Sequence, residues 1–312
     1  MEAVNLRAKN RSKKLGLIKR YIPLYIMLLF PIVSTFIFHY VPFYGIQIAF
    51  KNYRASLGIW GSEWVGLKHF SDFISHPYFW QMLRNTLLIS VCSLITFPCP
   101  VILTIMLNEL RSNKLRKFTQ LVTYAPHFIS VVVVCSITLM LISEDGGLLN
   151  IIIRALGGQG QEWIAKKSAF IPIYVISGLW QNLGWSTIIY VSAMAGIPLD
   201  RVEAAQVDGA GRLRVIWHIY LPHLKPTIIT MFIMNLGHVL SVGFEKIFLL
   251  QNPLNMEVSR VISTYSYSVG ILGGEYSYST AIGLFNNIIN IIMIVAANFI
   301  TKKVSNDEYG LW

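Results

Sequence analysis

Charged side chains are scarce in this sequence. Only 13% of its 312 residues are Asp, Glu, Lys or Arg, whereas 54% are hydrophobic. Soluble domains average about 25% charged residues, so the composition predicts a chain surrounded mainly by lipid. Among the charged residues, 15 are acidic and 26 are basic, which leaves a net charge of +11. Such a surplus is typical of chains that contact nucleic acid, an acidic partner or anionic lipid headgroups.

Several motifs of chemical function are also missing. The sequence has no G-x-x-x-x-G-K-[ST] phosphate-binding loop, and it has no H-E-x-x-H metal motif or converging nucleophile and base. Paired charges at the centre of apolar stretches and visible internal repeats, which are expected of a secondary transporter, are not evident either. We therefore expect a protein that is not an enzyme, that holds no metal or cofactor, and that draws its energy from another chain.

Cysteine is rare. Cys92, Cys99 and Cys135 all fall in apolar stretches, without C-x-x-C spacing or a neighbouring His. This pattern favours packing cysteines over a metal site or a disulfide framework.

Long apolar stretches are what the chain has most of. Crossing a hydrocarbon core of roughly 30 Å takes about 20 apolar residues in a helix. Six stretches are long enough, at residues 21–41, 82–107, 118–142, 170–197, 226–250 and 280–300. We predict an all-α polytopic membrane protein with six transmembrane helices. Most of the stretches contain Gly or Pro, so we expect kinked helices.

The basic residues give the predicted bundle a direction. Lys and Arg gather in residues 7–20, 111–117, 201–225 and 302–303, which six spans place on one side. The positive-inside rule makes this side cytoplasmic, with residues 1–20 and 302–312 as cytoplasmic termini and 21–301 as the transmembrane domain. The basic leader lacks a signal-peptide cleavage site, so the first span is expected to be retained. Charges clustered at span ends argue against nucleic-acid binding.

A smaller basic set falls on the opposite side of the predicted membrane. It includes Lys51, Arg54, Lys68, Lys246 and Arg260. Of these, Lys51, Arg54, Lys68 and Arg260 are candidates for meeting acidic groups on a partner or an acidic sugar, although a solvated surface is the favoured interpretation. The external segment 42–81 is aromatic, and part of it is expected to lie along the outer membrane surface as short helices. Residues 143–169 and 251–279 carry Gly pairs and are expected to be open loops.

The link at residues 198–226 is too polar to cross lipid. Asp200 followed by Glu203 suggests a capping box at the start of a short helix that runs to about Val207. Asp208-Gly209 offers a positive-φ position for a sharp turn. A second helix is then expected to end at about Pro222.

This link resembles the cytoplasmic loop of the inner-membrane permeases of ABC importers, which has the form E-A-A, three residues, G, nine residues, I, one residue, L-P. Glu203, Ala204, Ala205, Gly209, Ile219, Leu221 and Pro222 match every fixed position, and Asp208, Gly209 and Ala210 match the carbohydrate-importer form. The resemblance implies a location in a bacterial inner membrane. It also implies a coupling helix that fits a groove on a separate ATP-hydrolysing subunit. The sequence departs from sugar permeases at Ile216, where an aromatic residue is common.

A second resemblance covers residues 40–53, 64–70 and 83–90, which look like one branch of sugar permeases that handles oligosaccharides released from polysaccharides. It implies a heterodimer with a second, homologous permease. It also implies an extracytoplasmic sugar-binding protein as a further partner. It also implies an ATPase dimer that binds ATP and Mg. This chain would then form half of the pathway for an oligosaccharide. The alternative is a self-powered secondary transporter or channel for a polar solute, which stable association with an ATPase would exclude.

Polar residues inside the predicted spans are candidate substrate contacts, because they are costly in lipid. They are Trp180, Gln181, Asn182, Asn235, His238, Asn286, Asn287 and Asn290. Amides also join helices by hydrogen bonds, which is the alternative role for each of them. His238 has no second His or carboxylate one turn away, so a packed or pore-lining residue is favoured over a proton relay or metal ligand.

Overall fold

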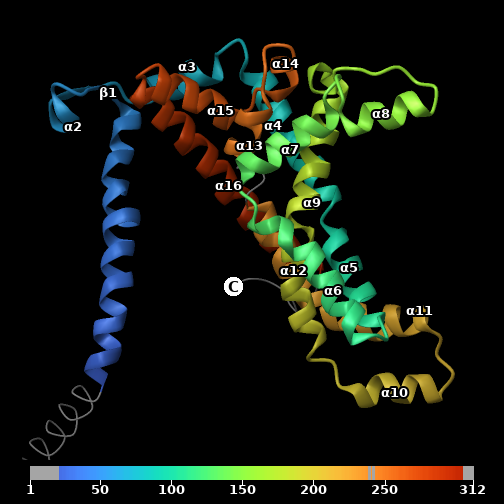
Figure 1. The fold of residues 1–312 in the computed structure, drawn as a ribbon. Helices are drawn as coiled ribbons and strands as arrows, with labels where there is room; N and C mark the ends of the chain where they lie inside the picture. Colours follow the sequence, from blue (N-terminus) through green and yellow to red (C-terminus); the bar gives the residue numbers. More distant parts are fainter. Residues whose placement is uncertain (1–20, 238–239, 241–242, 305–312) are drawn as a thin grey trace, which may run out of the picture. The chain divides into compact units, whose positions relative to one another are not determined.

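Figure 1 shows the fold as a computed structural model. The structure describes residues 21–237, 240 and 243–304. The predicted cytoplasmic N-terminus, residues 1–20, and most of the predicted C-terminus lie outside the described residues. By its internal contacts the chain divides into two units, one ending at His69 and the other beginning at Phe70. We describe each unit separately.

The first unit consists of a long helix and a small hairpin. The helix covers Tyr21–Phe50. It widens to a π-helix in η1 (Phe36–Tyr40) and tightens to a 3₁₀-helix in η2 (Val41–Phe50). The hairpin pairs β1 (Lys51–Arg54) with β2 (Ser62–Trp64) in antiparallel register, and α2 (Gly58–Gly61) lies between them. The sequence predicted short helices in part of the segment 42–81, and α2 is one of them, but it did not predict the strands. Aromatic residues suit strands as well as membrane surfaces, which made the pattern ambiguous.

The hairpin also changes the interpretation of Lys51. Its ammonium donates to the carbonyl oxygen of Ile59 at 2.7 Å and lies 5.7 Å from the centre of the Trp60 ring. The side chain is buried within its unit. Lys51 is therefore a structural residue of the hairpin and not the solvated surface cation that the sequence suggested.

The second unit begins within α3 (Lys68–Ile74) and contains two more long apolar helices. One is the pair α4 (Phe79–Ile95) and α5 (Pro98–Glu109), which together run from Phe79 to Glu109. The other is α16 (Tyr276–Val304). The joint between α4 and α5 falls just before Pro98, where the ring removes a backbone donor.

The third predicted span is sharply broken. It comprises α6 (Asn113–Tyr124), η3 (Ala125–Phe128) and α7 (Val131–Ile142), and the two halves meet at an angle of 103°. Ser130 starts α7 as its N-cap, because its hydroxyl oxygen accepts from the Val133 N–H at 3.3 Å. The break falls at Ile129 and Ser130, whose backbones are extended, shortly after Pro126.

The helix α9 (Lys167–Met194) is the central helix of the second unit and contacts α5, α6 and α12. Its 28 residues span about 42 Å at 1.5 Å per residue. Gly184 lets α6 approach its backbone closely. A Cβ atom added at Gly184 would lie 2.2 Å from the carbonyl oxygen of Thr123, so only glycine fits.

The predicted span 226–250 is interrupted. It is formed by α12 (Leu221–Leu236) and α13 (Phe244–Leu250), which are separate helices. Asn290 and Asn286 of α16 bond the backbone of Leu240 within the interruption: Asn290 Oδ1 accepts from its N–H at 3.1 Å, and Asn286 Nδ2 donates to its carbonyl at 3.2 Å. These amides supply partners that an unbroken helix would have provided.

By length and composition, three helices of the described chain can cross a membrane, or four if the bent pair forms one span. They are Tyr21–Phe50, Phe79–Glu109 and Tyr276–Lys303, with Asn113–Phe128 and Val131–Ile142 as the pair. The protein is thus a mostly helical membrane protein. The total of six spans stays a prediction, in which α9 and the broken pair α12 and α13 would be the other two.

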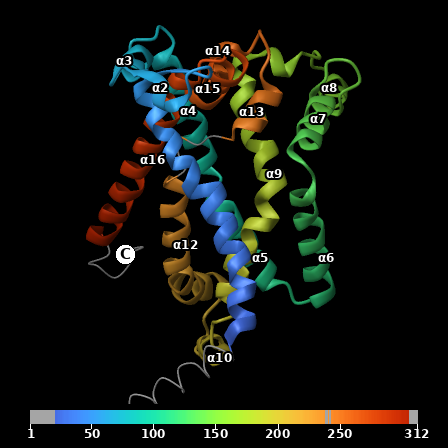
Figure 2. The same ribbon diagram turned by 90° about the vertical axis from the view of Figure 1, so that its left-hand side faces the viewer.

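The end of the second unit opposite α10 carries several short elements (Figures 1 and 2). They are α8 (Leu148–Ala155), η4 (Trp163–Ala165), α14 (Met256–Ser259), α15 (Ile262–Tyr267) and η6 (Ser268–Leu272). The sequence predicted open loops here, and the structure corrects this. Buried Asn150 shows why: its amide nitrogen donates to the Ser143 and Gln161 carbonyls, and its oxygen accepts from the Trp163 indole.

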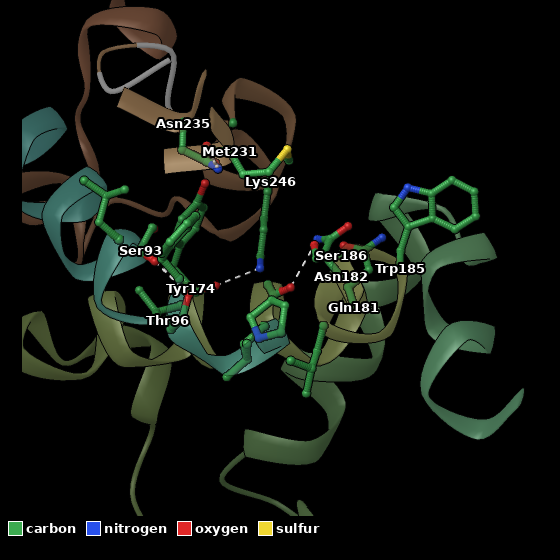
Figure 3. A pocket seen from close by; sticks show the side chains of 18 of the residues that line it. Ser93, Thr96, Tyr174, Gln181, Asn182, Trp185, Ser186, Met231, Asn235 and Lys246 are labelled. Carbon is green, nitrogen blue, oxygen red and sulfur yellow. Dashed lines mark hydrogen bonds between the residues drawn. The ribbon is translucent and has the colours of Figure 1, made fainter. Parts of the chain in front are cut away.

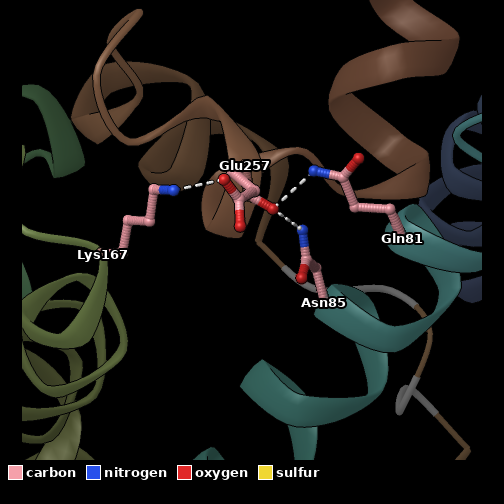
Figure 4. A network of polar contacts seen from close by, with 4 residues as sticks. All are labelled: Gln81, Asn85, Lys167 and Glu257. Atoms are coloured by element: carbon pink, nitrogen blue, oxygen red, sulfur yellow. Dashed lines mark hydrogen bonds and ion pairs between the residues drawn. The ribbon is translucent and has the colours of Figure 1, made fainter.

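A polar network holds α14 against α4 and α9 (Figure 4). The carbonyl oxygen of Glu257 accepts from Gln81 Nε2 at 2.6 Å and from Asn85 Nδ2 at 2.9 Å. Asn85 also donates to the Arg260 carbonyl at 3.0 Å. The carboxylate of Glu257 pairs with the Lys167 ammonium, which lowers the pKa of that carboxyl.

We expect Asn85→Leu to loosen α14. Asn85 is buried, so the substitution leaves the Arg260 carbonyl without this donor and the Glu257 carbonyl with Gln81 alone, at a cost of about 1–3 kcal/mol. Thermal unfolding in detergent and hydrogen exchange of residues 255–262 measure the effect. Gln81→Leu is the control, because its bond to the same carbonyl is exposed and water replaces it. Equal effects of the two substitutions would contradict this role of Asn85.

His76 adds a pH-dependent contact at the same end. Its Nδ1 accepts from the Tyr78 N–H at 3.2 Å, and its ring lies 5.0 Å from that of Tyr265. Burial and the positive charge of Arg260 lower the pKa of His76. Protonation removes the acceptor, so the fold holds this imidazole neutral.

A lowered pKa in the folded state means that the unfolded chain binds a proton first as the pH falls. We therefore expect the contribution of His76 to stability to be present above its unfolded pKa, near 6.5, and to decline as the pH drops below it. Unfolding temperatures from pH 7.5 to 5.5 test this. The pH dependence should shrink in His76→Asn, which keeps an acceptor, but not in His218→Asn. An unchanged profile in His76→Asn would refute it.

Candidate functional site

The polar link forms a helix, a turn and a second helix at one end of the second unit. The first helix is α10 (Leu199–Val207), and α11 (Arg212–Val215) follows the turn. Figures 1 and 2 show α10 beyond the ends of the long helices of the second unit. The predicted end of the first helix at Val207 is confirmed.

The turn after α10 is a Schellman motif. The Ala210 N–H donates to the Ala205 carbonyl at 2.8 Å, and the Gly209 N–H donates to the Gln206 carbonyl at 3.0 Å. Gly209 has φ of +79°, which confirms the predicted positive-φ turn. In such a motif the residues that correspond to Ala205 and Ala210 contact each other. The Schellman motif therefore accounts for the sequence spacing of Ala205, Gly209 and Ala210.

Two details of the predicted link are wrong. Pro198 occupies the N-cap of α10, so Asp200 and Glu203 form no capping box; Asp200 instead lies in the first turn, where the helix dipole favours a negative charge. The second helix does not end at Pro222, because η5 (Ile216–Tyr220) joins α11 directly to α12. The Leu221 N–H bonds the Ile216 carbonyl five residues back, and Pro222 has no N–H that needs a partner.

One side of the link packs inward. Val215, Tyr220 and Leu224 form a buried cluster with Val101, Tyr190 and Met194, and Ala205, Ala210, Ile219 and Leu221 pack against it. Burial and the nearby Glu109 carboxyl raise the pKa of Tyr220. The link is thereby fixed to α5, α9 and α12.

The other side of the link is exposed and unusually apolar. Leu199, Val207, Leu213 and Trp217 are 66–88% exposed, beside exposed Glu203, Ala204 and Asp208. Large apolar side chains that project from a polar link are typical of a protein-binding surface.

The second candidate site is a cavity of about 990 Å³ in the second unit (Figure 3). Its walls come from α4, α5, α7, α9, α12 and α13. Hydroxyl, amide and aromatic side chains share it with aliphatic ones: Ser90, Ser93, Thr96, Tyr174, Gln181, Asn182, Trp185, Ser186, Asn235 and Lys246. This volume lies at the upper end of the range for small-ligand sites.

Three predicted substrate contacts line this cavity, namely Gln181, Asn182 and Asn235. Gln181 is buried and its Nε2 donates to the Ile129 carbonyl at 3.0 Å, across the break before α7. Asn182 Oδ1 lies 3.1 Å from His127 Nδ1. Figure 3 shows these side chains on α9 beside Trp185.

The other predicted contacts do not line it. Trp180 and Asn287 are exposed elsewhere, and His238 lies outside the described residues. Asn286 and Asn290 face the interruption at Leu240, which is the helix-joining alternative that the sequence left open. A substrate role for any of these residues stays a prediction.

Lys246 is the lining residue that the sequence analysis misplaced. It was counted with the external surface, but the structure buries it, at 8% exposure, on the cavity wall. Its Nζ donates to the Tyr174 carbonyl at 2.7 Å and lies 4.7 Å from the centre of the Tyr174 ring. The available signal was a lone lysine inside an apolar stretch, which by itself marks a functional candidate.

The hydroxyl residues of the cavity were also missed, for a different reason. Ser93 and Thr96 donate to the carbonyls of Ile89 and Ser93 within their own helix and its end. Such local bonds let Ser and Thr occur anywhere in a span, so their presence in the sequence does not distinguish a lining position.

A mostly helical membrane protein with a polar internal cavity and a projecting helical link has the features of a membrane transport protein. The model of the binding-protein-dependent transport system inner membrane component family matches residues 96–306, and the chain belongs to this family. It is a permease subunit and not an enzyme. This confirms the resemblance of the link and excludes the alternative of a self-powered transporter.

Similar proteins agree. The chain is 41% identical over 308 residues to the Bacillus subtilis (strain 168) polygalacturonan/rhamnogalacturonan transport system permease protein YteP, covering 98% of this chain and 96% of that one. It is 42% identical over 290 residues to the protein LplB of the same organism, covering 93% and 91%.

Solved structures are also similar. A chain of a bacterial alginate ABC transporter, in complex with alginate pentasaccharide-bound periplasmic protein, has a TM-score of 0.84 at 36% identity, covering 94% of this chain and 98% of that one. A bacterial ABC transporter involved in the import of the acidic polysaccharide alginate gives the same TM-score and identity, with 94% and 99% coverage.

We expect Asn290→Leu to destabilise the interruption of the fifth predicted span. The substitution leaves the Leu240 N–H without its acceptor in a buried setting, at a cost of about 1–3 kcal/mol. Thermal unfolding in detergent is the measurement, and Asn287→Leu, at an exposed neighbouring position, is the control. If Asn290→Leu left stability unchanged and abolished only substrate response, the role of Asn290 would be substrate contact instead.

Proposed function

We propose that this permease subunit forms half of the translocation pathway for an oligosaccharide in an ATP-driven importer. The main observation in support of this proposal is the cavity, which combines amides, hydroxyls and Trp185 in a space of about 990 Å³. Sugars are held by aromatic faces and by amides that pair with hydroxyls. The names of YteP and of the alginate transporters, which refer to polysaccharides, support the same substrate class.

The substrate contacts are Gln181, Asn182 and Asn235, since these candidates line the cavity. Trp185 adds an aromatic surface: it stacks on His127 with 4.4 Å between ring centres and planes 7° apart, which fixes its orientation. Sugar passes between this chain and a second, homologous permease. The helix Tyr21–Phe50 is long and apolar enough to cross the membrane.

The topology is six spans with both termini in the cytoplasm of a bacterial cell, as the basic clusters indicate. Residues 1–20 and 302–312 are then the cytoplasmic ends, and 21–301 is the transmembrane domain. The end with α8, α14 and α15 faces outward, where the sugar-binding protein docks.

The link 198–226 is the coupling element that binds the ATPase dimer, which holds ATP and Mg. Leu199, Val207 and Leu213 provide an exposed apolar contact, with Glu203 and Ala204 between them. The turn at Gly209 and the inward-packed Ile219 and Leu221 hold this surface in place. Closure of the ATPase dimer moves α10, and the joined helix from α11 to α12 carries the movement to the cavity wall at Asn235.

Substitution of Gly209 tests this coupling. Gly209→Pro is incompatible with φ of +79° and removes the N–H that bonds Gln206. We expect the importer to assemble but the stimulation of ATP hydrolysis by sugar and binding protein to fall on the order of tenfold or more, within the range of coupling between sites. The assay uses the whole assembly in liposomes with a panel of oligosaccharides.

Gly211→Ala is the matched control, because Gly211 has an ordinary φ of −69° and accepts a side chain. Its stimulation should equal that of the wild type. Normal stimulation in Gly209→Pro would disprove the coupling role of the turn. Failure of any ATPase to copurify with the wild-type chain would disprove the proposed assembly.

A further inference from the structure

The lining of the cavity has many polar side chains and a positive charge, that of Lys246. Lys246 is the only charged residue among the described residues that line it. No Asp or Glu oxygen in the described chain lies within 4.0 Å of its Nζ. The cavity therefore presents a positive centre to whatever occupies it.

The ammonium of Lys246 is held but not neutralised. Its hydrogen bond to the Tyr174 carbonyl uses one of three N–H donors, and the Tyr174 ring adds a cation–π contact. Neither partner carries a negative charge. Burial of a charged group without a counter-ion is costly, so the position favours an anionic occupant.

The space around this ammonium is kept open. A Cβ atom added at Gly178 on α9 would lie 3.0 Å from Lys246 Nζ, and one added at Gly243 would lie 3.2 Å from the Tyr174 hydroxyl. Glycine at both places leaves room for Lys246 and Tyr174 to reach the cavity. Figure 3 shows the Lys246 side chain extending between Tyr174 and the amides of α9.

We propose that the cavity selects an acidic oligosaccharide, with the Lys246 ammonium pairing with the carboxylate of a uronic acid unit. Asn182, Gln181 and Asn235 then serve the hydroxyls of the same or a neighbouring ring. The inference deepens the proposed function and rests on it. Polygalacturonan and alginate, which appear in the names of similar proteins, are both polymers of uronic acids, and alginate is named there as an acidic polysaccharide.

The selectivity follows from charge-assisted hydrogen bonding. Bonds between an ammonium and a carboxylate are roughly twice as strong as neutral ones. A neutral sugar leaves the ammonium without a counter-ion, so the site discriminates against it. Lys246 is thus a specificity-determining residue for the substrate class.

The test compares an acid with its neutral ester. The complete importer, with binding protein, is reconstituted in liposomes and supplied with trigalacturonate or its fully methyl-esterified form. Uptake and stimulated ATP hydrolysis are measured for the wild type, Lys246→Met and Lys246→Gln. Gln keeps a donor for the Tyr174 carbonyl, so it separates loss of charge from loss of that bond. Each variant is compared with the wild type on the same sugar, which cancels the preference of the binding protein.

We expect uptake of trigalacturonate to fall at least about tenfold in both variants, as charge-assisted bonds imply. Uptake of the ester, assembly and basal ATP hydrolysis should stay near the wild-type level. Lys303→Met, which removes an exposed lysine from the last turn of α16, should leave both sugars unaffected.

Unchanged uptake of the acid in Lys246→Met, or equal loss of the acid and the ester, would overturn this inference. Loss of acid uptake in Met but not in Gln would also overturn it, because the neutral hydrogen bond would then suffice. A wild-type importer that responds to no sugar would count against the proposed function instead.

Discussion

The close approach of α6 to α9 at Gly184 is the contact on which the second unit depends. The Thr123 carbonyl lies where any Cβ at Gly184 would be, so the two backbones meet without intervening side chains. Along the same helix, Gln181 and Trp185 face the cavity, while Tyr190 and Met194 pack into the cluster beneath the link. A shift of α9 relative to α6 would therefore displace the cavity wall and the anchor of the link together.

In the fifth predicted span, side chains of another helix supply hydrogen-bond partners for backbone groups where the membrane helix is interrupted. The N–H and carbonyl of Leu240 bond to Asn290 and Asn286 of α16. The interruption separates α12, which continues from the link, from α13, which carries Lys246. The helix that continues from the link, α12, and the helix that carries Lys246, α13, are therefore separate helices.

Local rules predicted most of what depends on nearby residues. The end of α10 at Val207 and the turn at Gly209 follow from sequence alone, because one glycine fixes that geometry. The capping box failed since Pro198 already supplies the N-cap. The interruption at Leu240 was not predictable, because its partners lie about fifty residues away on α16.

Membership in the family was predictable from motif spacing, whereas the charge of the cavity was not. A lone lysine inside an apolar stretch marks Lys246 as a candidate, but its burial and its place on the cavity wall depend on Tyr174 and Gly178 of α9. The amides of the cavity were found because polar groups in spans are conspicuous. Amides that join helices, such as Asn290, cannot be distinguished in the sequence from amides that line the cavity.

The hydrogen bond between Lys246 and the Tyr174 carbonyl has one more consequence. An anion that enters does not meet a bare ammonium but competes with, or adds to, a bond that already exists. In either case the empty state is not left with the full penalty of an isolated charge. A partner that is kept in the empty state lowers the net gain on binding an anion, and a pathway that must release its cargo needs weak binding as much as it needs recognition.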